Sequence, residues 1–165
     1  MWGVLVAAIM LMLTSHYMVA DQKWLQTLED MNARIVAEDM ALYREAVIGY
    51  FTAHDLRNTN VDMSTLSSTF PSWSPLKNGI SMASWSNYRD ANGMIYIYAS
   101  SLPKVNITSE IVQLSRNSVL AGAFHTGDAS LYSPVFGDTG IPLTSLAVAG
   151  VIVPDGSPLW LATVR

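Results

Sequence analysis

The sequence predicts an α+β protein in which one long N-terminal helix packs on a small, mostly antiparallel β-sheet. Three zones of the chain predict this fold. Residues 1–20 carry no Asp, Glu, Lys or Arg, and residues 21–57 carry seven acidic and four basic side chains without a proline. Residues 58–165 carry only six acidic and five basic side chains and are rich in Ser, Gly, Pro and aromatic residues. We therefore expect a membrane segment, an amphipathic helix and a globular head, in that order.

Composition limits the classes of function. Half of the 165 residues are hydrophobic and 13% are charged, below the roughly 25% of typical soluble domains, which excludes disorder and favours a membrane or an assembly. The net charge is −4 and the nine basic residues are scattered singly, so binding to nucleic acid is not expected. The chain has no cysteine, which excludes disulfides, thiolate catalysis and the common zinc sites.

We expect residues 1–20 to cross a membrane once, because twenty helical residues span about 30 Å, the thickness of the hydrocarbon core. A cleaved export signal is the second alternative. It is less favoured because no Lys or Arg precedes the apolar run, and a cut after Ala20 would put Met18 where a small residue is preferred. A buried core helix is the third alternative.

Residues 21–57 predict an amphipathic helix that continues from the apolar segment without a break and ends at about His54. Its apolar residues recur at spacings of three, four and seven, which places them on one face: Leu28, Met31, Ile35, Leu42, Ala46, Gly49 and Ala53, with Trp24, Val36, Tyr43, Val47 and Tyr50 beside them. We expect the C-terminal half to pack as a core helix of the head. We expect the half from Asp21 to Ile35 to face another chain. The candidate partner-binding face consists of Trp24, Leu28, Met31, Ile35 and Leu42.

Residues 58–165 predict an α+β head. "VDMSTLSSTF" is typical of a short helix with Asp62 near its N-cap, and "ITSEIVQLSRNS" of another capped by Thr108 or Ser109. "SWSNYRDANGMIYIY" predicts a hairpin that turns at "RDANG". "VLAGAF" and "LAVAGVIVPDGSPLWLATV" supply three more strands, with "PDGS" as the turn of a second hairpin.

Motifs for chemistry are missing from the sequence. His16 lies in the apolar segment, His54 beside Asp55 is explained by polarity at a helix end, and His125 with Asp128 is typical of a surface turn. There is no Gly-x-Ser-x-Gly elbow, no Ser-x-x-Lys pair and no phosphate-binding glycine loop. The sequence therefore predicts a protein that is not an enzyme, with no catalytic, cofactor-binding or metal-binding residues.

The three-zone plan resembles the subunits of type IV pili and type II secretion systems, in which an apolar helix continues into an amphipathic half and a small α+β head. The chain departs from true pilins at its start. It lacks a basic leader, Gly3 is followed by Val4, and no acidic residue occurs within the first twenty. Processing by a prepilin peptidase is therefore not expected.

In size, and in the run "SWSNYRDANGMIYIY" followed by the terminal "VPDGSPLW", the chain resembles the small PilM family of conjugative thin-pilus systems, which is distinct from the actin-like protein of the same name. The resemblance covers nearly the whole chain. It implies a non-enzymatic inner-membrane component of the thin-pilus assembly apparatus or basal body, with its head in the periplasm and other apparatus proteins as partners. The resemblance implies no active-site residues.

Three functions follow from these patterns. The first is a single-pass assembly protein of the bacterial inner membrane that binds partner helices, with a homo-oligomer through the N-terminal helix as one form of it. The second is a minor pilin or pseudopilin that enters a fibre. The third is an exported soluble hydrolase or binding protein with a cleaved signal. Neither a cofactor nor a metal is expected for any of them.

Overall fold

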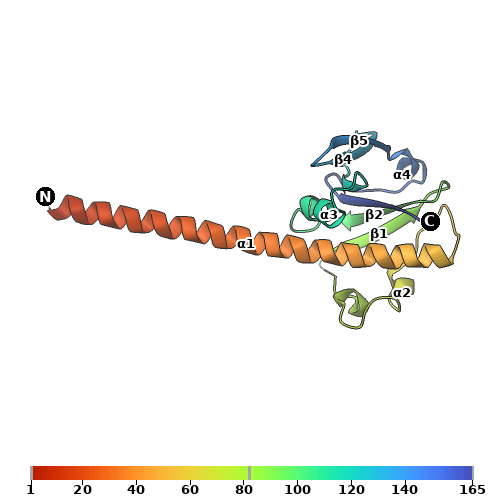
Figure 1. Cartoon of the computed structure of the whole chain (residues 1–165), viewed down its shortest axis with the longest axis horizontal. Helices are drawn as coiled ribbons and strands as arrows, with labels where there is room; N and C mark the ends of the chain where they lie inside the picture. The colour runs from red at the N-terminus through yellow and green to blue at the C-terminus, as the bar shows by residue number, and fades with distance from the viewer. Residues whose placement is uncertain (1, 82, 165) are drawn as a thin grey trace. The chain divides into compact units, whose positions relative to one another are not determined.

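One unbroken helix, α1 (Trp2–Ala53), forms the N-terminal part of the chain in the computed structural model (Figure 1). The structure describes the backbone of residues 2–81 and 83–164, and the side chains from residue 23 onward over the same ranges. The predicted helix end near His54 is confirmed. The chain divides into two compact units, Met1–Asn32 and Ala33–Arg165, so the boundary between them falls inside α1.

The predicted membrane segment, residues 1–20, lies outside the residues whose side chains are described. Within the described part of the chain, no helix combines the length and the apolar character needed to cross a bilayer. The membrane segment therefore stays a prediction from the sequence.

A six-stranded antiparallel sheet forms the centre of the head, which confirms the predicted α+β class. The strand order is β1-β2-β6-β3-β4-β5, and every neighbouring pair is antiparallel. The strands are β1 (Ser84–Arg89), β2 (Met94–Ser101), β3 (Ala121–Ala123), β4 (Ser130–Ser133), β5 (Gly137–Pro142) and β6 (Pro158–Thr163). The short helices are α2 (Met63–Leu66), the 3-10 turn η1 (Pro75–Asn78), α3 (Thr108–Leu114) and α4 (Thr144–Val148).

The predicted β1–β2 hairpin is confirmed, because its turn is determined locally. Asp90 Oδ1 accepts a hydrogen bond from the backbone N of Met94 at 2.8 Å. Gly93 supplies the positive φ, 87°, that returns the chain toward β2. Turn and strand propensity therefore agree over this segment.

Of the two caps predicted for the short helices, the structure confirms the position of one. Asp62 occupies the N-cap position of α2, but its side chain accepts no capping hydrogen bond. The cap predicted for α3 is wrong, because Ile107 is the N-cap residue and Thr108 already lies inside the helix. Asn106 Oδ1 accepts the hydrogen bond from the backbone N of Thr108 at 2.9 Å, so the polar group at this end comes from the residue just before the N-cap.

The second predicted hairpin is wrong. The "PDGS" turn does form, with Ser157 N donating to Pro154 O at 3.0 Å. The segment before it, however, contains α4 and an irregular stretch, residues 151–154, in place of the predicted first strand. The reason is non-local: β6 takes its neighbours from β2 and β3, which are distant in sequence. Such pairing leaves no local signal.

Strands β4 and β5 were not predicted from the sequence either. β5 contains Gly137, Gly140 and Pro142, which are unfavourable strand residues and hide its pattern. β3 and β4 approach so closely that a Cβ at Gly122 would collide with the backbone oxygen of Tyr132. Glycine at this position is therefore required by packing, which the sequence alone does not indicate.

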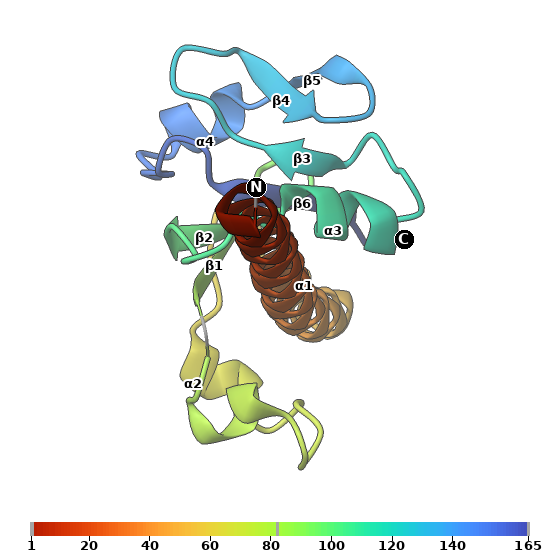
Figure 2. The same cartoon turned by 90° about the vertical axis from the view of Figure 1, so that its left-hand side faces the viewer.

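The sheet carries one hydrophobic core on each face. Ile95 and Ile97 face the C-terminal part of α1 and helix α3, and Trp160 of β6 lies opposite Ile97 on the same face. Tyr96 and Tyr98, the alternate residues of β2, face the core that α4 covers. Figure 2, like Figure 1, shows α4 and the C-terminal part of α1 on opposite sides of the sheet.

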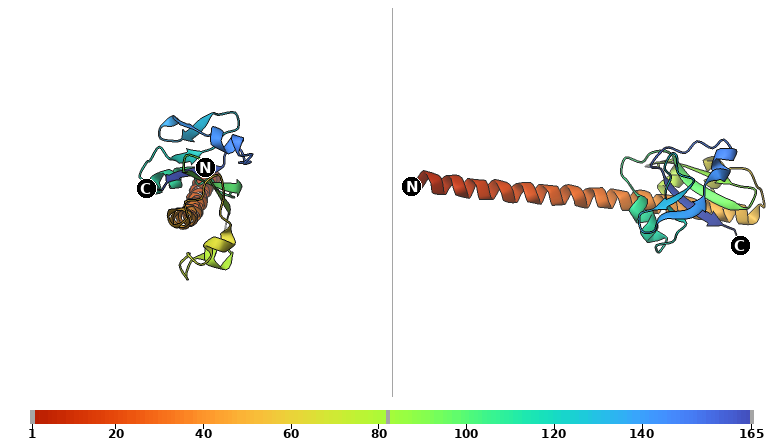
Figure 3. Two further views of the ribbon diagram at one scale, coloured as in Figure 1. Left: turned by 90° about the vertical axis from the view of Figure 1, so that its right-hand side faces the viewer. Right: turned by 90° about the horizontal axis from the view of Figure 1, so that it is seen from above.

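The prediction that the C-terminal half of α1 is a core helix is confirmed, but the buried residues include those predicted beside the central row, Val36, Tyr43 and Val47, and not the central row itself. Figure 3 shows this part of the helix running along the sheet. The buried row consists of Ala33, Val36, Ala37, Met40, Tyr43, Val47 and Phe51. Ile35 and Gly49 are exposed, and Leu42 is half-buried. Adjacent helical positions differ by about 100°, so α1 has two neighbouring apolar rows, and the sheet covers the one that contains Met40, Tyr43 and Phe51.

Asn87 of β1 connects α1, the segment before α2 and the sheet. Its Nδ2 donates to Tyr43 Oη at 2.6 Å and to Val61 O at 2.8 Å, and its Oδ1 accepts from Val61 N at 2.9 Å. Asn87 is buried, so water cannot hydrogen-bond to its amide group. These three contacts satisfy the amide instead. Burial raises the pKa of Tyr43 to about 12, while the hydrogen bond from Asn87 acts in the opposite direction.

We expect the free energy of unfolding to fall as pH rises from about 10 toward 12. In that window folded Tyr43 keeps its proton, whereas an unfolded tyrosine, with a pKa of 10.0, has lost it. The Tyr43 contribution is fully present below pH 10 and is lost as pH rises through 12. Two pKa units correspond to roughly 2–3 kcal/mol.

Urea denaturation of the parent and of Tyr43→Phe, at several values between about pH 8 and about pH 11.5, measures this contribution. The variant should lose less stability over the alkaline range. Identical pH dependence of the two proteins would contradict the assignment.

Candidate functional site

Large apolar side chains remain exposed on the N-terminal part of the described helix. Helical spacings of four, three and four place them on one face of α1. We name this set the exposed row: Trp24, Leu28, Met31 and Ile35, which are 70%, 51%, 57% and 45% exposed. Leu25, which the sequence prediction did not include, is 62% exposed beside it. The role of the row as a partner-binding face stays a prediction.

Leu42, the fifth predicted contact residue, lies in a different setting. It is half-buried and packs at the margin of the core. Together with Ile35 it lines a pocket of about 390 Å³, whose other wall is formed by Trp73 and Pro75. The structure thus brings Ile35 and Leu42 together with a segment of the head that the sequence prediction left out.

A second pocket of about 360 Å³ adjoins the first, because both share Leu42 and Glu45. It is lined by Ala46 and Gly49 of α1 and by residues 69–71. We name the two pockets together the α1 groove. Its walls are α1 from Ile35 to Gly49 and the segment 69–75.

Local structure fixes the segment that forms the second wall. Ser74 Oγ accepts a hydrogen bond from the backbone N of Leu76 at 3.3 Å and caps η1. Phe70 and Leu76, on either side of the wall, are buried in the core beneath α1. Trp73 lies between them but is 72% exposed. A tryptophan between two serines in a proline-rich turn was the available sequence signal.

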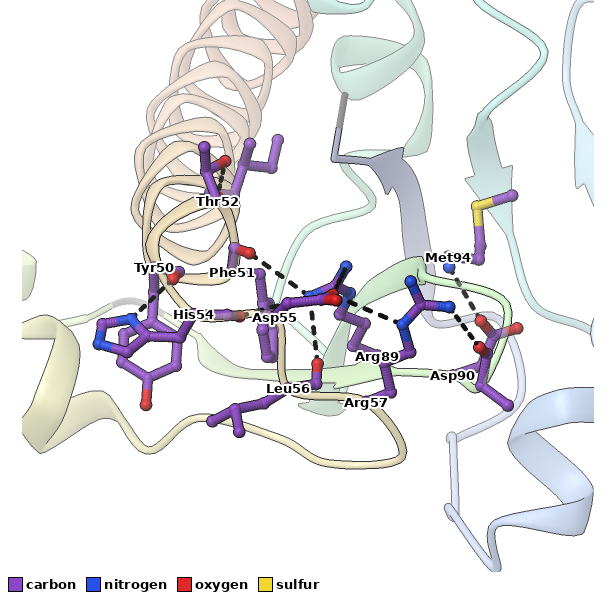
Figure 4. Close-up of polar contacts among 12 residues, drawn as sticks. Tyr50, Phe51, Thr52, His54, Asp55, Leu56, Arg57, Arg89, Asp90 and Met94 are labelled. Atoms are coloured by element: carbon purple, nitrogen blue, oxygen red, sulfur yellow. Dashed lines mark hydrogen bonds and ion pairs between the residues drawn. The ribbon is translucent and has the colours of Figure 1, made fainter.

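Arg89 of β1 fixes the C-terminal end of α1 (Figure 4). Its Nη1 donates to the backbone oxygens of Phe51, His54 and Leu56 at 3.4, 3.4 and 3.1 Å, and its Nη2 donates to Asp55 Oδ1 at 2.9 Å. The last carbonyls of a helix have no partner within it, and the helix dipole favours a cation there. Arg89 is only 4% exposed, so these are the contacts that compensate its burial.

Arg57 adds a more exposed contact at the same end of α1. Its Nη1 donates to Ala91 O at 3.0 Å, in the turn between β1 and β2, and its Nε lies 3.5 Å from Asp55 Oδ1. Asp55 therefore lies between two guanidinium groups. This arrangement confirms the prediction that the polar residues at 54 and 55 serve the end of the helix.

The histidines take structural positions where they are described. His54 Nδ1 lies 3.0 Å from Tyr50 O, and the His54 ring stacks on the Tyr50 ring at 4.5 Å. The predicted turn at His125 is confirmed by a hydrogen bond from Asp128 N to His125 O at 3.1 Å. His16 lies outside the described side chains. In the described part of the chain, no three His, Asp or Glu side chains are grouped as metal ligands.

The fold and this surface define a class: an α+β head built on a long N-terminal helix that keeps a second apolar row outside the core. A sequence model of the family described as PilM matches residues 8–161. The chain belongs to the PilM family of thin-pilus systems, which confirms the resemblance found in the sequence and gives it a role related to pilus assembly. No curated protein and no solved structure matches the chain.

We expect Arg89→Met to lower the free energy of unfolding by about 3 kcal/mol, because it removes the buried donor to the backbone oxygens of Phe51 and Leu56 and to Asp55. Arg89→Lys should lose less, since an ammonium keeps the charge but cannot reach several acceptors at once. Arg57→Met is the matched control, and its half-exposed guanidinium predicts a loss below about 1 kcal/mol. Equal losses at 57 and 89 in urea denaturation would refute the anchoring role.

Proposed function

We propose that this protein is a non-enzymatic component of the thin-pilus assembly apparatus or basal body, held in the bacterial inner membrane by residues 1–20 with its head in the periplasm. It acts by binding other apparatus proteins through α1 and the head. The observation that carries this proposal is the exposed row, because α1 has two apolar rows and the head covers only one of them.

The size of the exposed side chains supports a protein partner for this row. Fully burying a Leu, Ile or Met side chain stabilises a complex by roughly 1.5–3 kcal/mol relative to leaving it in water. Trp24, at 70% exposure, offers the largest area, and tryptophan is enriched among the residues that dominate protein interfaces. A partner helix that covers the row gains several such contributions along one line.

The sequence supports the membrane part of the proposal, and the family supports the kind of partner. Residues 1–20 have no charged side chain, and α1 runs from Trp2 to Ala53 without interruption. Membership in the PilM family supports partners among pilus assembly proteins.

Introducing carboxylates into the exposed row should abolish co-purification with the pilus apparatus. We expect the double variant Leu28→Asp, Ile35→Asp to lose its partners while its Tm stays within a few degrees of the parent, because both side chains are exposed. Val148→Asp, Ile152→Asp is the matched control, since these residues are 88% and 87% exposed outside α1. Unchanged co-purification of the first variant would show that the row is not the contact surface.

Membrane retention tests the anchor separately. We expect the mature protein to have an intact mass that includes residues 1–20 and to stay in the membrane fraction after carbonate extraction. A mature form that begins after residue 20 would instead establish a cleaved signal. Recovery in sheared pili, with a shortened N-terminus, would identify a minor pilin.

A further inference from the structure

The α1 groove is long enough to hold a short helix. Its α1 wall extends from Ile35 to Gly49, and fourteen helical steps at 1.5 Å correspond to about 21 Å, or about four turns of a bound helix. The two pockets share Leu42 and Glu45 in their linings. In Figure 1 the segment around α2 lies on the side of α1 opposite the sheet, so this wall is separate from the core that the sheet covers.

Gly49 has no explanation within the fold. It lies inside α1, where glycine is the least favourable residue apart from proline. Its φ is not positive, and a Cβ placed on it would have nothing within 4 Å. Neither backbone conformation nor packing within the chain therefore requires glycine. With Ala46 beside it, Gly49 leaves the backbone of α1 open to close approach by another segment.

The opposite wall presents Trp73. This side chain is 72% exposed, yet Phe70 and Leu76, which are 3% and 1% exposed, hold its backbone against the core. A large aromatic side chain on a fixed backbone loses little conformational freedom when it is covered. Such residues are enriched among interface anchors.

The negative charge along the groove favours a cationic partner. Of the described residues that line the two pockets, all the ionisable ones are acidic: Glu38, Asp39 and Glu45. Glu38 pairs with Arg34 along the helix, and Glu45 is exposed where the pockets meet. A second copy of this groove would bring carboxylates against carboxylates, which disfavours self-association here. A segment with Lys or Arg beside its apolar residues has the complementary charge.

We propose that the α1 groove binds a cationic amphipathic helix of another protein. Its apolar side chains pack between Leu42 and Trp73, its backbone approaches α1 at Gly49, and its Lys or Arg side chains face Glu45 and Glu38. The inference rests on the proposed function only in placing this second protein within the pilus apparatus. The groove itself is independent of the exposed row except at Ile35.

Photo-cross-linking in membranes of pilus-producing cells tests the inference on the full chain. A benzophenone amino acid replaces Leu42 in one protein and Trp73 in another, and mass spectrometry maps the linked peptides. We expect both positions to link to the same segment of one other protein, with apolar residues on one helical face and Lys or Arg beside them. Links only to this chain, to an acidic segment or to lipid, or no link at all, would overturn the proposal.

Two substitutions, each with a control, separate binding from folding. Gly49→Leu fills the groove where there is free space, so we expect the adduct to fall at least about tenfold, a loss of about 1.4 kcal/mol in binding, with Tm equal to or above that of the parent. Thr52→Leu adds a leucine at an exposed site of α1 outside the groove and should keep the adduct. Glu45→Lys should weaken the adduct, whereas Asp128→Lys, at an exposed carboxylate elsewhere, should not.

The outcomes distinguish this inference from the proposed function. If Gly49→Leu keeps the adduct, the groove is not the binding site, even where co-purification with the apparatus persists through the exposed row. If the linked cationic helix belongs to a protein outside the pilus apparatus, the groove inference stands and the assembly role is wrong.

Discussion

The packing of one row of α1 against the sheet is the constraint on which the rest of the structure depends. Met40, Tyr43, Val47 and Phe51 are buried there, at 1% exposure or less. Two residues of β1 fix the helix in place: Asn87 through Tyr43, and Arg89 through the carbonyl groups at the helix end. Because a helix is rigid, fixing this row also fixes where every other row of α1 within the head must point.

That constraint also determines the direction in which the second apolar row faces. With Val36 and Tyr43 facing the sheet, Ile35 and Leu42 must face the segment 69–75, where they form the wall of a groove in place of a core. Earlier along the helix the same row is exposed. Family membership gives the chain a role related to pilus assembly, and the proposed binding of neighbours uses the two apolar surfaces of α1 that the sheet does not cover.

Local chemistry explains how much of this the sequence could predict. The extent of α1 and the β1–β2 hairpin depend on propensity and turn residues a few positions apart, and both were predicted correctly. The partners of β6 lie 63 and 39 residues earlier in the chain in the pairs Ile97–Trp160 and Ala121–Trp160, and no local pattern specifies them. Choosing between two apolar rows about 100° apart likewise depends on the sheet, and Trp73, which lines a pocket with Leu42, was not predicted from the sequence.

Amide hydrogen exchange along α1 in the purified full chain tests the central claim most directly. If the sheet holds only the C-terminal part of the helix, amides from about residue 36 to residue 51 should exchange slowly, near the rate of global unfolding, and those from 24 to 32 much faster. Uniform protection along the whole helix, or slow exchange confined to residues 24–32, would contradict the account.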